Sequence, residues 1–276
     1  MPAILRPLSL GLLLDETFDI YRRNFLLFLG ISAIPNGALL LILILFDKTL
    51  GTILDGIGTG AYLGALFTIV AIVLVPSIVT AATTFAVSDV YLERPTSIRS
   101  CFSRVSGRTL KVVAVSFCVG FIVGVGTLLF LVPGIYWAGM YGIAIPAVVL
   151  ENINVRQSLS RSVALTQDFR LRVIVVYFLT SIFAGIMNYA LNAGLLWLWP
   201  IIHPHLVHLT RLNLRDISSI LSKTLFGPVS AIGLTLVYYD LRVRKEAFDL
   251  DQMVDLMGDT KNVAAEGAQQ SAVGSQ

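Results

Sequence analysis

Charge is scarce in this chain. Only 13% of its 276 residues are Asp, Glu, Lys or Arg, whereas 56% are hydrophobic and the mean hydropathy is +0.81. Soluble domains carry about 25% charged residues, so this composition excludes an ordinary soluble domain. Apolar runs of 17 to 27 residues recur along the chain, and about 20 apolar residues cross a bilayer as a helix. The sequence therefore predicts a multi-pass α-helical membrane protein.

Cysteine and catalytic motifs are also lacking. The two cysteines, Cys101 and Cys118, have no histidine or aspartate spaced nearby for metal binding or nucleophilic catalysis, and their positions argue against a disulfide framework. The sequence contains no motif for phosphate, dinucleotide or zinc-protease chemistry. It also places no clear charge at mid-bilayer depth, where ion-coupled pumps usually carry one. We therefore expect no enzyme, no cofactor and no nucleic-acid partner.

Six apolar segments have the length of membrane spans. They cover about residues 25–46, 61–87, 112–132, 134–150, 173–199 and 221–239. Pro133-Gly134 predicts a tight turn between the third and the fourth. The expected fold is an all-α polytopic bundle of six transmembrane helices, arranged as three hairpins that are each preceded by a cytoplasmic amphipathic helix. One domain covers residues 1–257, and the Gly-, Ala-, Gln- and Ser-rich residues 258–276 are expected to form a disordered cytoplasmic tail.

The three polar helices, at residues 8–23, 94–111 and 154–167, each show an apolar face at helical spacing, which is typical of helices that lie along a membrane surface. In the first, with Ser9 as its N-cap, the face holds Leu10, Leu13, Leu14, Thr17 and Tyr21. In the second it holds Ile98, Cys101, Phe102 and Val105, and in the third Val155, Leu159 and Val163, with Arg161 opposite.

The distribution of positive charge predicts the orientation. Sixteen of the 20 Lys and Arg residues fall in the N-terminus, in residues 94–111, in residues 156–172 and in the C-terminus, and four fall in the intervening segments. Lys and Arg are enriched in cytoplasmic loops. Both termini and all polar helices are therefore expected on the cytoplasmic side of the inner (plasma) membrane.

The polar helices and the span ends follow a repeating pattern. Residues Ile98–Arg104 match Val155–Arg161 at three of seven positions, which suggests three units of surface helix plus hairpin. Each unit ends with an acid, Asp89, Glu151 or Asp240, at a cytoplasmic helix end where a negative charge opposes the helix dipole. We expect these acids to pair with nearby cations. The candidates are Arg99, Arg104, Arg156, Arg161, Arg242, Arg244 and Lys245. Such a collar is either a structural salt-bridge network or a site for anionic lipid headgroups.

Other polar groups give weaker signals. Asn36, beside Pro35 in the first span, and Asn188 with Asn192 in the fifth are candidates for an intramembrane polar site, or for hydrogen bonds that hold helices together. His203, His205 and His208 cluster in one segment, but no carboxylate or cysteine lies near them to complete a metal site. They are the weak candidates for metal binding.

Three stretches resemble a known bacterial family. They are LSLGLLLDETFDIYRRNF from Leu8, VPGIYWAGMYGIAIPAVVLE from Val132 with the Arg- and Ser-containing helix after it, and PVSAIGLTLVYYDLRVRKEAFDL from Pro228. The chain, up to about Met257, resembles the six-span proteins grouped with the membrane domain of glycerophosphoryl diester phosphodiesterases. The resemblance implies an integral membrane protein of mostly unassigned role. Phosphodiesterase activity in that family belongs to a separate soluble barrel domain, which has no counterpart in this sequence, so no catalytic residue carries over.

The sequence is best explained by a non-enzymatic inner-membrane protein that acts as a scaffold or contacts lipids, anionic ones in particular. A small-molecule facilitator or transporter component is the alternative, because four of the spans contain a proline and Asn36 lies beside one of them. A protein partner or a second copy of the chain is a further expectation.

Overall fold

The fold is all-α, as the sequence predicts. The computed structural model describes residues 8–45, 60–202 and 218–246, and within these ranges every regular element is a helix. The N-terminal elements are α1 (Leu10–Arg23), α2 (Phe25–Leu45), α4 (Gly60–Tyr91) and α5 (Ile98–Ser106). The central elements are α6 (Thr109–Leu129), α7 (Leu131–Tyr141), α8 (Ala144–Glu151) and α9 (Val155–Thr166). The last two elements are α10 (Arg170–Ile202) and the C-terminal helix (Ser218–Glu246).

Five described segments are long and apolar enough to cross a membrane. They are Val73–Tyr91, Thr109–Leu129, Leu131–Glu151, Arg170–Leu195 and Ser218–Glu246. α1 and α2 meet the same criterion only as a pair, and this pair is bent by 78° at Asn24. With the bent pair the number of segments reaches six, so the chain has the elements of a multi-pass membrane protein.

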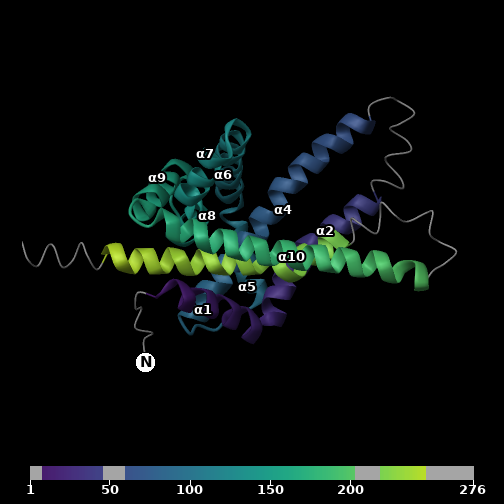
Figure 1. Cartoon of the computed structure of the whole chain (residues 1–276), viewed down its shortest axis with the longest axis horizontal. Helices are drawn as coiled ribbons and strands as arrows, with labels where there is room; N and C mark the ends of the chain where they lie inside the picture. Colours follow the sequence, from purple (N-terminus) through teal and green to yellow (C-terminus); the bar gives the residue numbers. More distant parts are fainter. Residues whose placement is uncertain (1–7, 46–59, 203–217, 247–276) are drawn as a thin grey trace, which may run out of the picture.

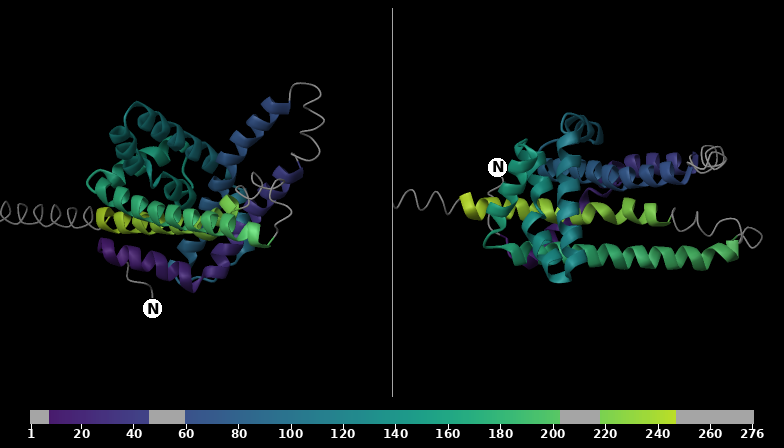
Figure 2. Two further views of the ribbon diagram at one scale, coloured as in Figure 1. Left: turned by 45° about the vertical axis from the view of Figure 1, so that its right-hand side comes forward. Right: turned by 90° about the horizontal axis from the view of Figure 1, so that it is seen from above.

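The helices pair in the expected hairpins. α2 packs on α4, α6 on α7, and α10 lies beside the C-terminal helix along the long axis of the molecule (Figure 1). The last pair is antiparallel, because Ser218 donates a hydrogen bond to Asn192 at one end and Arg172 lies 2.9 Å from Asp240 at the other. α6 and α7 instead run across the direction of α10 and the C-terminal helix (Figure 2).

The central and peripheral helices differ in the share of their residues that is buried inside the protein. In the most apolar part of α4, 61% of residues are buried inside the protein, and in the C-terminal helix 56%, whereas α6 and α10 each bury only 17%. Many large apolar side chains of α6 and α10 are therefore exposed, which is the surface expected of helices that face lipid. The core is centred on the end of the C-terminal helix, where Leu236, Tyr238 and Leu241 are fully buried.

The turn of the second hairpin lies earlier than the sequence predicts. α6 ends at Leu129 and α7 begins after Phe130, whereas Pro133 and Gly134 lie in the first turn of α7. A proline cannot donate to the carbonyl four residues before it, and its ring collides with that carbonyl. For Pro133 the carbonyl belongs to Leu129. The proline therefore breaks the helix one turn upstream of itself and then starts the next helix.

A second proline breaks the return helix between α7 and α8. Pro146 lies in the first turn of α8, so the hydrogen bond that it cannot make is the one to Gly142, in the break. The end of α7 is left with carbonyls that have no helical partner. Two hydroxyls of α9 supply donors, because Ser162 and Thr166 lie 2.8 Å and 3.2 Å from the Met140 oxygen.

This repair explains why the buried face of α9 is only in part the predicted one. The buried residues of α9 are Ser158, Ser162, Leu165 and Thr166. The apolar positions chosen from the sequence, Val155, Leu159 and Val163, are only partly buried. Arg161 does not point away from the protein but contacts Glu151. Val155 and Leu159 flank the buried face and pack against the core, so polarity predicts the edge of this face. It misses the centre, where hydroxyls donate to the carbonyl at the break in the neighbouring helix.

The other surface helices follow the sequence more closely. Ser9 caps α1, accepting a hydrogen bond from the Leu12 N–H at 3.3 Å. α1 buries Leu13, Thr17 and Ile20. Leu10, placed on the buried face by its spacing, is 36% exposed. α5 buries Cys101 and Val105 from its predicted face.

Two helices run longer than their predicted spans. α4 continues to Tyr91, past the expected end near residue 87, so Asp89 lies inside its last turn. The C-terminal helix continues through Asp240 to Glu246 instead of ending near residue 239. Asp89 and Asp240 therefore do not terminate their helices, whereas Glu151 is the last residue of α8. The predicted tail at 258–276 and the three histidines lie outside the described residues.

Candidate functional site

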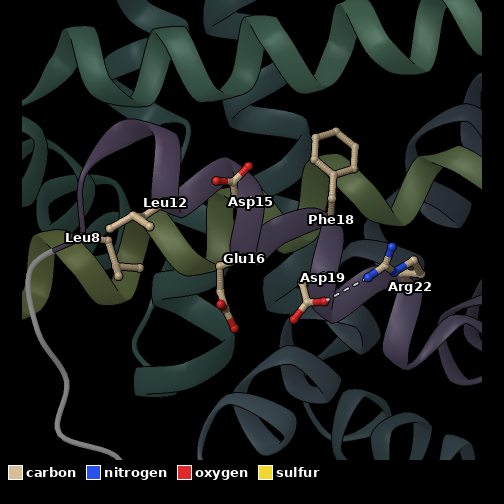
Figure 3. Close-up of a pocket in the computed structure, with 7 residues that line it drawn as sticks. All are labelled: Leu8, Leu12, Asp15, Glu16, Phe18, Asp19 and Arg22. Atoms are coloured by element: carbon tan, nitrogen blue, oxygen red, sulfur yellow. Dashed lines mark ion pairs between the residues drawn. The ribbon is translucent and has the colours of Figure 1, made fainter.

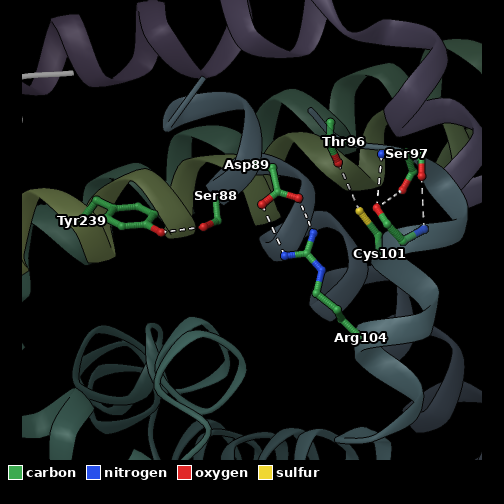
Figure 4. A network of polar contacts seen from close by, with 8 residues as sticks. Ser88, Asp89, Thr96, Ser97, Cys101, Arg104 and Tyr239 are labelled. Atoms are coloured by element: carbon green, nitrogen blue, oxygen red, sulfur yellow. Dashed lines mark hydrogen bonds and ion pairs between the residues drawn. The ribbon is translucent and has the colours of Figure 1, made fainter. Parts of the chain in front are cut away.

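The first ion pair joins the end of α4 to α5. Asp89 is 4% exposed, and both oxygens of its carboxylate face the guanidinium of Arg104, with Arg104 Nη1 3.3 Å from Oδ1 (Figure 4). The same guanidinium lies over the ring of Phe85, 4.7 Å from its centre. The hydrogen bond to Asp89 raises the pKa of Arg104 above its usual value, because it stabilises the charged form.

Local sequence explains how Arg104 reaches Asp89. Glu93 adopts a left-handed backbone conformation (φ 55°), and the chain reverses after α4 as Arg94 N–H returns to the Asp89 carbonyl at 2.7 Å. Ser97 then caps α5 in a reciprocal pair of hydrogen bonds with Ser100, each 3.2 Å long (Figure 4). These contacts fix the start and the rotation of α5, so its Arg104 faces back toward α4.

The second ion pair joins the end of α8 to α9. Arg161 Nε lies 3.0 Å from Glu151, and Arg161 Nη2 lies 2.9 Å from Glu246 of the C-terminal helix. Burial lowers the pKa of Arg161, but its hydrogen bonds to Glu151 and Glu246 outweigh burial, and the pKa is raised overall. Glu246 also binds Arg242 at 2.9 Å. Arg242 therefore pairs with Glu246, an acid that was not among the candidates.

The third site surrounds Asp240, whose side chain is fully buried. Arg172 of α10 and Arg244 place their Nε atoms 2.9 Å and 3.0 Å from Asp240 Oδ2. The N–H of Leu8 donates to Oδ1 at 2.8 Å, and both arginines donate to the carbonyl of Leu8. Asp240 therefore ties the residue just before α1 to α10 and to the C-terminal helix.

Three consecutive residues of the C-terminal helix connect these sites. Tyr238 donates a hydrogen bond of 2.6 Å to Glu151, and the hydroxyl of Tyr239 lies 2.7 Å from that of Ser88, the neighbour of Asp89 (Figure 4). The next residue, Asp240, pairs with Arg172 and Arg244. Successive helix residues point about 100° apart, so the triplet can reach three separate helix ends at once. We call the three acids with Arg104, Arg161, Arg172, Arg244, Tyr238 and Tyr239 the collar.

The sequence identified part of the collar. Each acid pairs with one of the candidate cations: Asp89 with Arg104, Glu151 with Arg161, and Asp240 with Arg244. Arg172 and Glu246 were missed, as was the role of both tyrosines. Arg172 lies in the first turn of α10, just before the predicted start of the fifth span at residue 173. The signal for the tyrosines was present, since two hydroxyl groups directly precede an acid at a span end.

Other candidate residues lie apart from the collar. Arg99 and Arg156 are exposed, and neither makes an ion pair with any described residue. Asn192 binds Asn188, 2.8 Å between Nδ2 and Oδ1. Asn36 is buried in α2, and no hydrogen bond within the described ranges joins it to either of these two asparagines. Within those ranges no group of three His, Cys, Asp or Glu residues could hold a metal ion.

A groove follows the exposed side of α1. Its volume is about 460 Å³, and it is lined by Leu8, Leu12, Asp15, Glu16, Phe18, Asp19 and Arg22 (Figure 3). Asp19 pairs with Arg22 at 3.7 Å and with Arg23 at 2.8 Å, so part of the negative charge is neutralised within α1. None of the asparagines lines this groove.

The fold and the collar define the chain as a multi-pass α-helical membrane protein. Comparison with protein-family models, curated proteins and solved structures gives no match. The function must therefore be argued from the residues themselves.

Proposed function

We propose that this protein is a non-enzymatic scaffold of the bacterial inner (plasma) membrane, and that it binds anionic lipid headgroups beside a rigid cytoplasmic collar. The proposal is based on the arginines of α5 and α9, because each helix carries one arginine that an acid neutralises and one that is exposed. On each helix one arginine, Arg104 or Arg161, is neutralised by an acid. The other, Arg99 or Arg156, is exposed and makes no ion pair with a described residue.

The positions of Arg99 and Arg156 favour an anion. Each is the second residue of its helix, where the helix dipole is positive and a cation is disfavoured. A headgroup phosphate bound there would be stabilised by the arginine and by the free N–H groups of the first turn. The collar acids would not compete for these arginines, because each acid already has its own partner.

The collar supports a scaffold rather than a catalyst. Each of its three acids is paired with an arginine, so none of the collar acids is left free for proton transfer. The excess of Lys and Arg on the segments that carry the collar favours the cytoplasmic side, with both termini there. The resemblance to the membrane domain of the glycerophosphoryl diester phosphodiesterase family fits an integral membrane protein of this kind. A protein partner or a second copy of the chain would bind a scaffold of this type.

We also propose that α1, α5 and α9 begin three related units. When their N-caps, Ser9, Ser97 and Asn154, are aligned, the fourth residue after the cap is buried in every unit, and so is the eighth. Arg104 and Arg161 occupy the same seventh position. α1 carries Glu16 there, and the acid beside the start of α1, Asp240, takes Arg172 and Arg244 of the third unit as its cations instead.

The test removes the exposed arginines without touching the ion pairs. The double variant R99Q/R156Q should retain less cardiolipin or phosphatidylglycerol after purification, measured by mass spectrometry of bound lipid. A basic residue near an anionic surface contributes about 1 kcal/mol, so affinity for vesicles containing phosphatidylglycerol should fall roughly 30-fold.

The matched control is S103E/S160E. These serines are exposed on the same two helices, and the double substitution changes the net charge by the same amount. A specific headgroup site predicts a large loss only for R99Q/R156Q. Unchanged lipid retention in that variant, or an equal loss in both variants, would show that the arginines form no such site.

A further inference from the structure

The hairpin from α6 to α8 has the surface of a lipid-embedded segment. No charged residue occurs between Lys111 and Glu151. The side chains around its turn are exposed in the folded chain: Leu128 is 87% exposed, Phe130 74% and Val132 76%. Exposed apolar side chains of this size, with no polar residue among them, require an apolar environment.

The backbone of the turn is equally suited to hydrocarbon. A polar backbone group without a partner costs several kcal/mol in lipid, so a turn there must leave few of them. This turn consists of a single residue, Phe130, whose N–H donates to Gly126 O at 3.0 Å and whose carbonyl accepts from Gly134 N–H at 3.4 Å. Pro133 removes a further N–H from the first turn of α7.

Both ends of the hairpin are attached at the collar end of the bundle. Arg108, just before α6, donates to the Val149 carbonyl near the end of α8, and Lys111 Nζ lies 3.4 Å from Asn152 O. Arg108 also lies over the ring of Phe85, the ring that stacks on the collar residue Arg104. α6 therefore begins beside the collar.

The turn itself also stays near that end. Tyr136 of α7 accepts a hydrogen bond from Arg170, the first residue of α10, and the guanidinium lies 4.8 Å from the centre of the tyrosine ring. Further along α7, Gly139 is so close to Ile174 that a Cβ would lie 2.4 Å away. Contacts along α7 thus remain within the first turns of α10, beside Arg172 of the collar. α7 crosses α10 rather than following it (Figure 2).

These contacts limit how deep the turn can lie. Phe130 is six residues from Tyr136, about 9 Å along the helix axis. A turn that reached the opposite membrane surface would lie about 30 Å from the collar surface. α6 has 21 residues and is about 31 Å long, so it could cross the bilayer only if it stood upright. Its attachments show that it lies across the bundle.

We propose that the hairpin from α6 to α8 does not cross the membrane but lies within the leaflet on the collar side, with lipid acyl chains as its partner. This inference does not rest on the proposed headgroup site. α6 is about 31 Å long and α7 about 16 Å, and at a width of about 10 Å the two helices displace roughly 470 Å² of one leaflet only. Insertion into one leaflet makes membrane association sensitive to curvature, as it is for interfacial helices.

The test locates the turn by leaflet-specific quenching. Phe130→Cys, in a C101A/C118A background of the full-length protein, is labelled with a bimane fluorophore and reconstituted in one orientation. Spin-labelled phosphatidylcholine is then placed in a single leaflet. We expect loss of fluorescence when the quencher is in the collar-side leaflet and no loss when it is in the other. Val132→Cys, equally exposed, should give the same result.

Two control positions define the leaflets. Leu26→Cys, at the start of α2, should be quenched from the collar side. Leu74→Cys lies on α4, fifteen residues or about 22 Å from Asp89, and should be quenched from the opposite side. Quenching of the Phe130 label from the opposite leaflet would overturn the proposal. So would reaction of Phe130→Cys with a membrane-impermeant maleimide from either side of intact vesicles.

Discussion

Asp240 shows most directly how this chain tolerates charge in an apolar setting. Its carboxylate is fully buried, which is costly unless the charge is paired and its oxygens accept hydrogen bonds. Arg244 and the Leu8 N–H donate hydrogen bonds to the carboxylate, and Arg172 adds a second positive charge 2.9 Å away without a hydrogen bond to it. Both arginines also donate to the Leu8 carbonyl. The residue therefore fixes three segments that are remote in sequence: the start of α1, the start of α10 and the end of the C-terminal helix.

Replacing Asp240 by Asn should destabilise the protein strongly. The substitution keeps the size of the side chain but leaves Arg172 and Arg244 close together without a counter-charge. Removing one partner from a buried pair costs about 3–5 kcal/mol. Thermal unfolding in detergent, followed by circular dichroism, should show a lower Tm. Glu246→Gln is the control, because the Glu246 side chain is 44% exposed and exposed pairs contribute about 0–1 kcal/mol. Equal shifts in Tm for the two variants would contradict a special role for Asp240.

At the scale of elements, the sequence predicts which helices exist better than where they break. The all-α fold follows from apolar run length, and the presence of acid–arginine pairs follows from charge placed at span ends, although which arginine pairs with which acid does not. The breaks at Phe130 and after Tyr141 do not, because a proline acts on the carbonyl four residues earlier and the prediction placed the turn at the proline itself. The centre of the buried face of α9 does not follow from polarity for a related reason: its hydroxyls donate to a carbonyl at a break in another helix.

The hairpin between α6 and α7 depends on close approach at a glycine. A Cβ on Gly134 would lie 2.1 Å from Thr127 Oγ1 and 2.7 Å from the Thr127 backbone nitrogen, and the backbone cannot move aside as a side chain can. Gly134→Ala should therefore separate the two helices. Overpacking typically costs about 1–3 kcal/mol, which should appear as a lower Tm in detergent.

Gly120→Ala is the matched control for that variant. Gly120 lies on α6, where a Cβ would meet no atom within 4 Å, and alanine is the better helix former. The Tm of Gly120→Ala should stay the same or rise. If Gly134→Ala is as stable as Gly120→Ala, the close contact does not hold the hairpin together.

At the scale of the whole molecule, the collar makes the C-terminal helix a shared support for the other hairpins. Tyr238 reaches Glu151 at the end of the second hairpin, and Tyr239 reaches Ser88 beside Asp89 at the end of the first. A change at either acid should shift this helix and weaken the contact at the other. Sites that share a rigid element couple by about 0.5–3 kcal/mol, whereas independent sites add within about 0.3–0.5 kcal/mol.

A double-mutant cycle measures that coupling. D89N, E151Q and the double variant are compared by unfolding free energy in mixed micelles, and the sum of the single effects should differ from the double effect by more than about 0.5 kcal/mol. A second cycle pairs D89N with N192L, at the far end of α10, and should be additive because Asn192 contacts Asn188 and Ser218 rather than the collar. Additivity in both cycles would mean that the three ion-pair sites act separately. Coupling in the first cycle alone would mean that the consecutive Tyr238, Tyr239 and Asp240 unite the hairpins into one cooperative structure.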